Sequence, residues 1–181
     1  MNIQVTYRLT RRLSMRIVKN GDLHVSVPIG LSKKKVMQFI EEHHDWIIEA
    51  RKKTLEKVQA RHDFFDQLPL STCKQIEEAK GRLKTIIEPM VEYHSKEMGV
   101  KPTAITYKKM ISRWGQCNVK TRTICFSMYL LLLPEWCQEH VVVHELCHLL
   151  EPSHNARFHA LMDKYYPKWR EARKETKSYG K

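Results

Sequence analysis

The chain has 181 residues and a formal net charge of +12, with 32 lysine and arginine against 20 aspartate and glutamate residues. A chain of this length buries a core without disulfide bonds. Its five cysteines are odd in number and form no Cys-x-x-Cys pair, which predicts reduced thiols in the cytoplasm. There is no signal peptide and no apolar run near the ~18 residues of a membrane span, so we expect no membrane partner.

The positive charge favours an anionic partner, such as nucleic acid or a nucleotide. Much of the excess lies in three short segments, residues 33–35, residues 51–53 and the C-terminal stretch RKETKSYGK. These segments are equally consistent with solvated helix faces. We find no aromatic RNA-binding signature, zinc-finger spacing or heptad zipper that would decide between the two interpretations.

The N-terminal third alternates between polar and apolar residues over 3–29, and Asn20-Gly21 is a hairpin signal between two such runs. We therefore expect two or three antiparallel strands. Ser32 then suits an N-cap, and apolar residues at helical spacing predict one helix from about 33 to 60. This hairpin and helix form an extension over residues 1–70.

A break over residues 61–70 precedes a second long helix, which begins at Ser71 or Thr72. Its interior contains Pro89, which is expected to kink or divide it. Gly99 suits the C-cap of this helix.

The remaining elements follow in order. We expect strands at AITYKKM (104–110) and RTICFSMYL (122–130), a turn-like break at SRWGQC (112–117), and helices at about 134–150, 155–165 and after Pro167. Helices packed on a small antiparallel sheet make the fold α+β.

The segment VVVHELCHLLEPSH, residues 141–154, places ionisable side chains in an apolar helix. His144 and His148 are four residues apart, so both rings lie on one helix face and can bind one zinc ion at roughly 2.0–2.1 Å. Glu145 is rotated by ~100° from His144, which makes it a poor third ligand. As in other HExxH helices, it can accept a proton from a water whose pKa the metal lowers.

A catalytic zinc takes three protein ligands and leaves one position open. His154 follows His148 by six residues, the interval of the metzincin pattern HExxHxxGxxH, with Glu151 where that pattern has glycine. The alternative is a downstream carboxylate, Glu171 or Glu175, as in gluzincins. We favour His154, because the alternative leaves a histidine without a role directly after the helix.

Four segments together resemble the YgjP-like metallopeptidase family: HHDWI (43–47), SRWGQC, LLLLP and VVVHELCHLLEPSHNARF. The resemblance covers nearly the whole chain. It implies a minimal zincin core over residues 71–181, with His144, His148 and His154 as zinc ligands and Glu145 as base. More distantly, the chain is similar to SprT-like proteases, which act on protein crosslinked to DNA. Gln116 stands where the family pattern has serine, and Pro152-Ser153 precede His154 where asparagine is common.

Arg113, Trp114 and Gln116 are candidates for substrate binding, since an edge strand beside a zincin metal helix pairs with extended substrates. Gly115 would permit a tight turn, and Arg113 suits a carboxylate or phosphate. The structural alternative is that Trp114 packs beneath the metal helix and Arg113 pairs with Glu151. Other residues are expected in the core or as unreactive thiols, namely Phe158, Trp169, Cys117 and Cys147.

These observations predict a zinc-dependent hydrolase with one zinc ion, and most directly a metallopeptidase acting on peptides or proteins. The first alternative is a metal-dependent hydrolase of nucleotides, of the nucleoside triphosphate pyrophosphatase or phosphatase type, since a zinc site also supports attack on phosphorus. The second is a nucleic-acid-associated zinc protein or a DNA-linked protease. A purely structural zinc has no use for the free acid Glu145.

Overall fold

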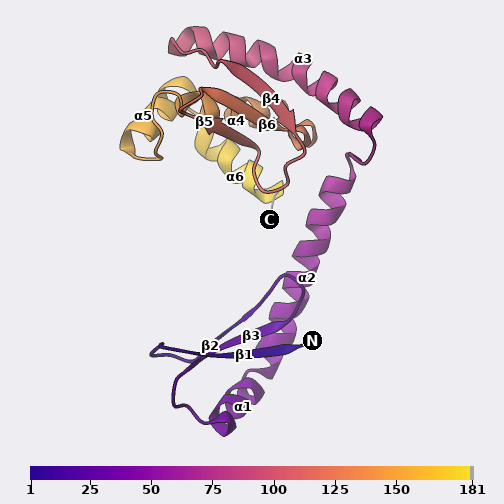
Figure 1. Ribbon diagram of the computed structural model, residues 1–181, viewed down its shortest axis with the longest axis vertical. Helices are drawn as coiled ribbons and strands as arrows, with labels where there is room; N and C mark the ends of the chain where they lie inside the picture. Colours follow the sequence, from indigo (N-terminus) through magenta and orange to yellow (C-terminus); the bar gives the residue numbers. More distant parts are fainter. Residues whose placement is uncertain (180–181) are drawn as a thin grey trace. The chain divides into compact units, whose positions relative to one another are not determined.

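The computed structural model describes residues 1–179, which fall into two compact units, residues 1–62 and the residues from 63 onward (Figure 1). The described residues form helices together with two three-stranded sheets. This confirms the α+β class. No helix among the described residues is long and apolar enough to cross a membrane.

The first unit contains a three-stranded sheet of β1 (Ile3–Arg8), β2 (Ser14–Ile17) and β3 (Leu23–Pro28). The central strand β3 buries one alternating face, through Leu23, Val25 and Val27. Strands β2 and β3 form an antiparallel hairpin, and Gly21 supplies the left-handed conformation (φ +82°) that its turn needs.

Strand β1 runs parallel to β3, so the expectation of purely antiparallel strands is wrong. The reason lies in the topology: the hairpin inserts β3 between β1 and β2, and β3 then runs in the same direction as β1.

Two helices replace the single helix expected over 33–60. They are α1 (Lys33–Glu42) and α2 (His44–Asp66). The break is at His43, whose ring Nδ1 lies 2.8 Å from the carbonyl oxygen of Phe39 and whose backbone leaves the helical region. Val36, Ile40 and Ile47 pack against the sheet as the core of the first unit. The expected break from residue 61 begins only after Asp66.

The long helix α3 (Cys73–Met98) of the second unit begins with a capping box. The Thr72 hydroxyl accepts from the Gln75 backbone N–H at 3.2 Å, and the Gln75 side chain accepts from the Thr72 N–H at 3.0 Å. Gly99 closes the helix in the left-handed conformation, as expected. Pro89 lies inside α3 without dividing it.

The second sheet consists of β4 (Ala104–Lys108), β5 (Gly115–Asn118) and β6 (Thr123–Ser127), in the order β4-β6-β5. It repeats the topology of the first sheet: β6 is parallel to β4 and antiparallel to β5. The predicted antiparallel sheet is therefore mixed. The segment expected to be a turn-like break, residues 112–117, contains most of the edge strand β5. The expected strand to residue 130 ends at Ser127, where the 3₁₀ helix η1 (Met128–Leu132) begins.

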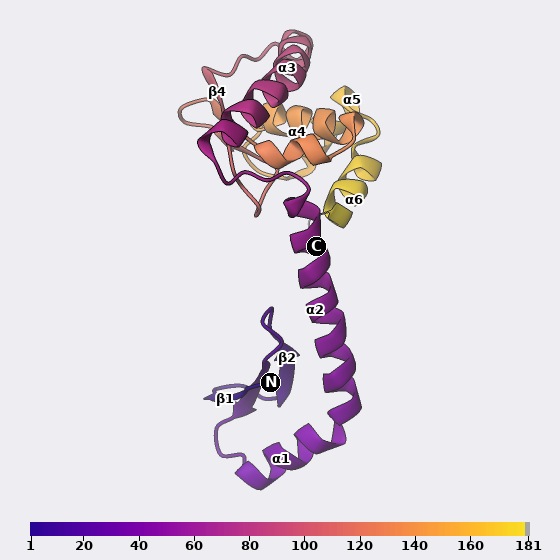
Figure 2. The same cartoon turned by 90° about the vertical axis from the view of Figure 1, so that its right-hand side faces the viewer.

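Three shorter helices complete the unit: α4 (Glu135–Cys147), α5 (Ala156–Tyr165) and α6 (Trp169–Tyr179). Helix α4 lies at the centre, in contact with α3, α5, α6 and β5, and Figure 2 shows it between α3 and α6. Its residues Val142, Val143 and Leu146 are fully buried. The motif helix is therefore the core helix of this unit.

Two glycines, one inside α3 and one at its C-cap, are predicted to change the free energy of unfolding in opposite directions when replaced by alanine. Neither has an atom within 4 Å of an added Cβ, but only Gly99 has a positive φ, of +64°. Gly99→Ala should lower the free energy of unfolding by about 1–2 kcal/mol through left-handed strain. Gly81→Ala should raise it by about 0.5–1 kcal/mol, because alanine favours the helix interior. Urea denaturation measures both, and equal signs would contradict the assignment of the helix end.

Candidate metal centre

Three imidazoles meet where α4 ends. His144 lies in its last turn, His148 is its C-cap residue, and His154 follows in the connection to α5. One nitrogen from each ring lies within 4.8 Å of the other two, and the Nε2 atoms of His144 and His154 are 3.0 Å apart. Among the described residues, these three form the one histidine, cysteine or carboxylate group with metal-site spacing.

The chain turns sharply after His148, which brings His154 back to the helix. The helix ends at Cys147 and not near residue 150, and the Glu151 N–H donates to the Cys147 carbonyl at 2.8 Å. Asn155 then caps α5, with its side-chain oxygen 3.0 Å from the Phe158 N–H. The turn thus forms without the glycine of the metzincin pattern.

Phe158 packs against all three imidazoles. Its ring centroid lies 4.9 Å from that of His144, 4.7 Å from that of His148 and 4.7 Å from that of His154. Sequence reasoning assigned Phe158 to the core, where it does lie with 1% of its surface exposed, but missed its contact with the candidate ligands. Its position four residues after His154, on the helix that follows, was the available signal.

The three histidines are neutral near pH 7. Burial lowers the pKa of His144 to about 3, with smaller contributions from the neighbouring histidines and Arg173. Burial also lowers the pKa values of His148 and His154. The Nδ1–H of His148 donates to the Glu151 carbonyl at 3.2 Å, which leaves its Nε2 lone pair free. Three neutral imidazoles with converging nitrogens fit the ligand set of zinc.

Glu145 is buried beside these rings, with 5% of its surface exposed. Burial raises the pKa of its carboxyl to about 8, partly offset by a backbone hydrogen bond from Cys117 and by the charge of Arg113. A cation at the histidines would favour the ionised carboxylate again. The group is thus poised to exchange a proton near neutral pH.

Gly115 makes room for Glu145. A Cβ atom at position 115 would lie 2.6 Å from Oε1 of Glu145, closer than side chains approach. Gly115 belongs to β5 and has no positive φ, so the expected tight turn is not its role. Its missing side chain lets the edge strand lie directly against the motif helix.

The contact between Gly115 and Glu145 is flanked in the chain by the candidate substrate-binding residues Arg113, Trp114 and Gln116. The Arg113 Nη1 donates to Oε1 of Gln116 at 3.1 Å, so the expected pairing with Glu151 does not form. Glu151 instead lies 4.0 Å from Arg157. Trp114 is partly buried and packs against Phe64 and Phe65, with ring centroids 6.2 and 6.1 Å away.

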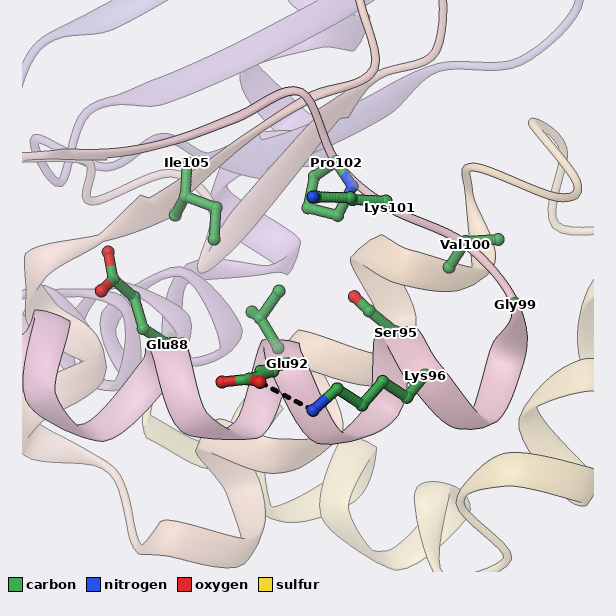
Figure 3. Close-up of a pocket in the computed structure, with 10 residues that line it drawn as sticks. Glu88, Glu92, Ser95, Lys96, Gly99, Val100, Lys101, Pro102 and Ile105 are labelled. Carbon is green, nitrogen blue, oxygen red and sulfur yellow. Dashed lines mark hydrogen bonds and ion pairs between the residues drawn. The ribbon is translucent and has the colours of Figure 1, made fainter.

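Two hollows meet at Glu145. One, of about 490 Å³, is lined by the three histidines, Glu145 and residues of β5. The other, of about 250 Å³, lies on the far side of Gly115 towards α6. A larger hollow of about 670 Å³ lies between α3 and the start of β4 and includes the Glu92–Lys96 ion pair (Figure 3). No histidine lines it, so the chemistry belongs to the first two.

Comparison with known proteins identifies the family. The family model described as "YgjP-like, metallopeptidase domain" matches residues 11–71 and 72–179. The chain belongs to the YgjP-like metallopeptidases. The resemblance drawn from the four sequence segments is thereby confirmed, and the chain is a metal-dependent peptidase by family.

Two solved structures are also similar. The metallopeptidase zymogen of Pyrococcus abyssi abylysin is 22% identical, with a TM-score of 0.45 over 50% of this chain and 93% of that one. The metallopeptidase zymogen of Methanocaldococcus jannaschii jannalysin is 19% identical, with a TM-score of 0.45 over 51% and 94%. No curated protein matches the chain.

Gly115→Ala should destabilise the protein, because the new methyl group overlaps the buried Glu145 carboxylate and the strand or the helix must move. The expected loss is about 1–3 kcal/mol in the free energy of unfolding, as for other overpacked cores. Urea denaturation measures it, with Gly81→Ala as the control at an open site. An unchanged stability would show that β5 does not press on Glu145.

Proposed function

We propose that the chain is a zinc-dependent peptidase in which His144, His148 and His154 hold one zinc ion and Glu145 is the general base. The observation that carries this proposal is the convergence of three neutral imidazoles beside a buried carboxylate, in a member of a metallopeptidase family. The donor set suits zinc, which prefers nitrogen ligands in groups of three at catalytic sites.

The zinc ion would lower the pKa of a water and polarise the scissile carbonyl. Glu145 takes the proton of the attacking water and later delivers it to the leaving amine. Its buried position keeps bulk water from the carboxylate. Because Gly115 has no side chain, strand β5 can lie close to this carboxylate. His148 is fixed in the ligand tautomer by the Glu151 carbonyl, and Phe158 restrains the three rings.

The position of the edge strand β5 favours a peptide as the substrate. It pairs with β6 on one side only, and Gly115, Gln116 and Cys117 line the hollow that contains the histidines. An extended peptide can add to such an edge through main-chain hydrogen bonds. Arg113 and Gln116 are exposed at this edge, where we assign them to substrate contact.

We assign the peptidase domain to residues 71–181 and treat residues 1–70 as an N-terminal extension. The candidate site residues all lie in the second compact unit. All five cysteines are free thiols, which supports a reducing compartment, and we propose the cytoplasm.

The third ligand is tested by removing it. His154→Ala should weaken zinc binding by more than about 100-fold, the upper end of the loss that follows removal of an outer-shell partner. Glu171→Ala, at an exposed carboxylate of α6, is the matched control and should bind one zinc per chain like the wild type. Competition with a chelator measures both, and the reverse pattern would replace His154 by a carboxylate ligand.

Glu145→Gln separates catalysis from structure. The amide keeps the size of the side chain but cannot accept the proton, so the rate should fall by roughly 10²–10⁴-fold while one zinc remains bound. The measurement is cleavage of an unfolded protein by the zinc-loaded full chain, with and without DNA. Full activity of Glu145→Gln would remove the base from the proposal.

The same proteins decide between hydrolysis of peptide bonds and hydrolysis of nucleoside triphosphates. Wild type and Glu145→Gln are offered a panel of nucleoside triphosphates beside the protein substrate. Glu145-dependent release of phosphate or pyrophosphate without any proteolysis would leave a zinc hydrolase and overturn the peptidase. If DNA stimulates proteolysis and this stimulation weakens with added salt, the net charge of +12 would have a role in binding nucleic acid.

A further inference from the structure

The hollow of about 250 Å³ beside Glu145 has a cationic lining. Helix α4 supplies its floor with His140 and Val141, and α6 supplies a wall with Arg173 and Lys177. Arg113, which precedes β5 in the chain, also lines the hollow. Three basic residues therefore line one small space, and Glu145 is the single carboxylate among the residues that line it.

These cations are available for a ligand. The ion pairs found among residues 1–179 include neither Arg173 nor Lys177, although other basic residues of the same region are paired, such as Arg170 with Asp163. Arg113 donates to the neutral amide of Gln116, and its charge also helps to lower the pKa of Glu145. A carboxylate entering the hollow would meet guanidinium groups, whose forked N–H donors match its two oxygens.

The floor carries a further polar group. His140 is 5% exposed, and its Nδ1 has no hydrogen-bond partner within the part of the chain that the structure describes. Buried polar atoms are rarely left unpaired in native proteins. The unpaired Nδ1 is closed off from solvent and does not reach the hollow, so the basic side chains of the lining carry the argument.

The pocket adjoins the reacting atoms. It shares Arg113, Gly115, His144 and Glu145 with the larger hollow that contains the three histidines. A substrate lying in that larger hollow would therefore place a neighbouring group in the cationic pocket. The volume of about 250 Å³ lies below the range of roughly 300–1,000 Å³ for sites that enclose whole small molecules, which favours a single side chain or chain end.

We propose that this pocket is a specificity subsite for a carboxylate of the peptide substrate, and that Arg173 and Lys177 of α6, with Arg113, select peptides with an acidic group next to the scissile bond. The carboxylate belongs either to an aspartate or glutamate side chain or to the C-terminus of the peptide. The inference rests on the proposed peptidase function and adds the substrate class.

Binding is measured first, so that the result does not depend on hydrolysis. The probes are fluorescent alanine-rich peptides that carry Glu, Gln or Lys at one position, each made with a free or an amidated C-terminus. They are titrated into the full-length, zinc-loaded Glu145→Gln protein. The acidic peptides should bind roughly 10-fold tighter than the Gln peptides, as for a charge-assisted hydrogen bond, and the difference should shrink with salt. The amidated series distinguishes a side-chain carboxylate from the chain end.

Charge reversal at Arg173 and Lys177 of α6 tests whether these residues cause the preference for acidic peptides. Combined with Glu145→Gln, the double change Arg173→Glu and Lys177→Glu should abolish the preference for Glu and give a preference for Lys. This gain of binding would not follow from simple misfolding. Lys174→Glu makes the same type of change on the same helix outside the pocket lining and should leave the preference for Glu intact.

The outcomes separate this inference from the peptidase function. Peptides cleaved by the wild type without any charge preference would overturn the subsite and leave the peptidase. Acidic peptides bound in an Arg173-dependent way, but cleaved by no active form, would keep the carboxylate-binding pocket and overturn the peptidase, and with it the role of the pocket in cleavage specificity. Absence of peptide binding, or Arg173-dependent binding of nucleoside triphosphates alone, would also overturn the subsite.

Discussion

The burial of α4 is the constraint on which the second unit depends. This helix contacts α3, α5, α6 and β5, yet it carries buried ionisable side chains in its last turn. Each is accommodated by a specific neighbour: Phe158 covers the imidazoles, and Gly115 leaves space for the carboxylate of Glu145. Because burial keeps the imidazoles neutral and their nitrogens converge, the same packing that hides α4 also prepares a place for a cation.

Helix α6 connects this packing to the proposed specificity pocket. Its buried side, with Trp169, Ala172 and Thr176, lies in the core of the unit, and the Thr176 hydroxyl is tied to the Ala172 carbonyl at 2.5 Å. Next to this buried side, Arg173 and Lys177 line the small hollow beside α4 together with Thr176. The backbone that carries these basic residues is thus anchored by apolar packing, which gives the proposed pocket more precision than a loop would.

The sequence was informative where structure is local. The spacing of His144 and His148 and the cap at Gly99 follow from neighbours within one helical turn, and both were predicted. The start of α3 was predicted at Ser71 or Thr72, and Thr72 is the N-cap. Strand direction was not, because alternation of apolar residues does not reveal which strand a hairpin inserts between two others. The strand β5 was missed for a related reason: Gly115 suggested a turn, whereas its cause is a contact with a side chain thirty residues later.

The placement of Phe158 has a kinetic consequence. The short segment from the end of α4 through the first turn of α5 contains His154, the capping Asn155 and Phe158. A local opening of this segment would release one imidazole and uncover the other two at the same moment, while the core of α4 stays folded. The exchange rate of a bound ion would then follow the opening of this segment, measurable as amide hydrogen exchange, and not the global unfolding of the protein.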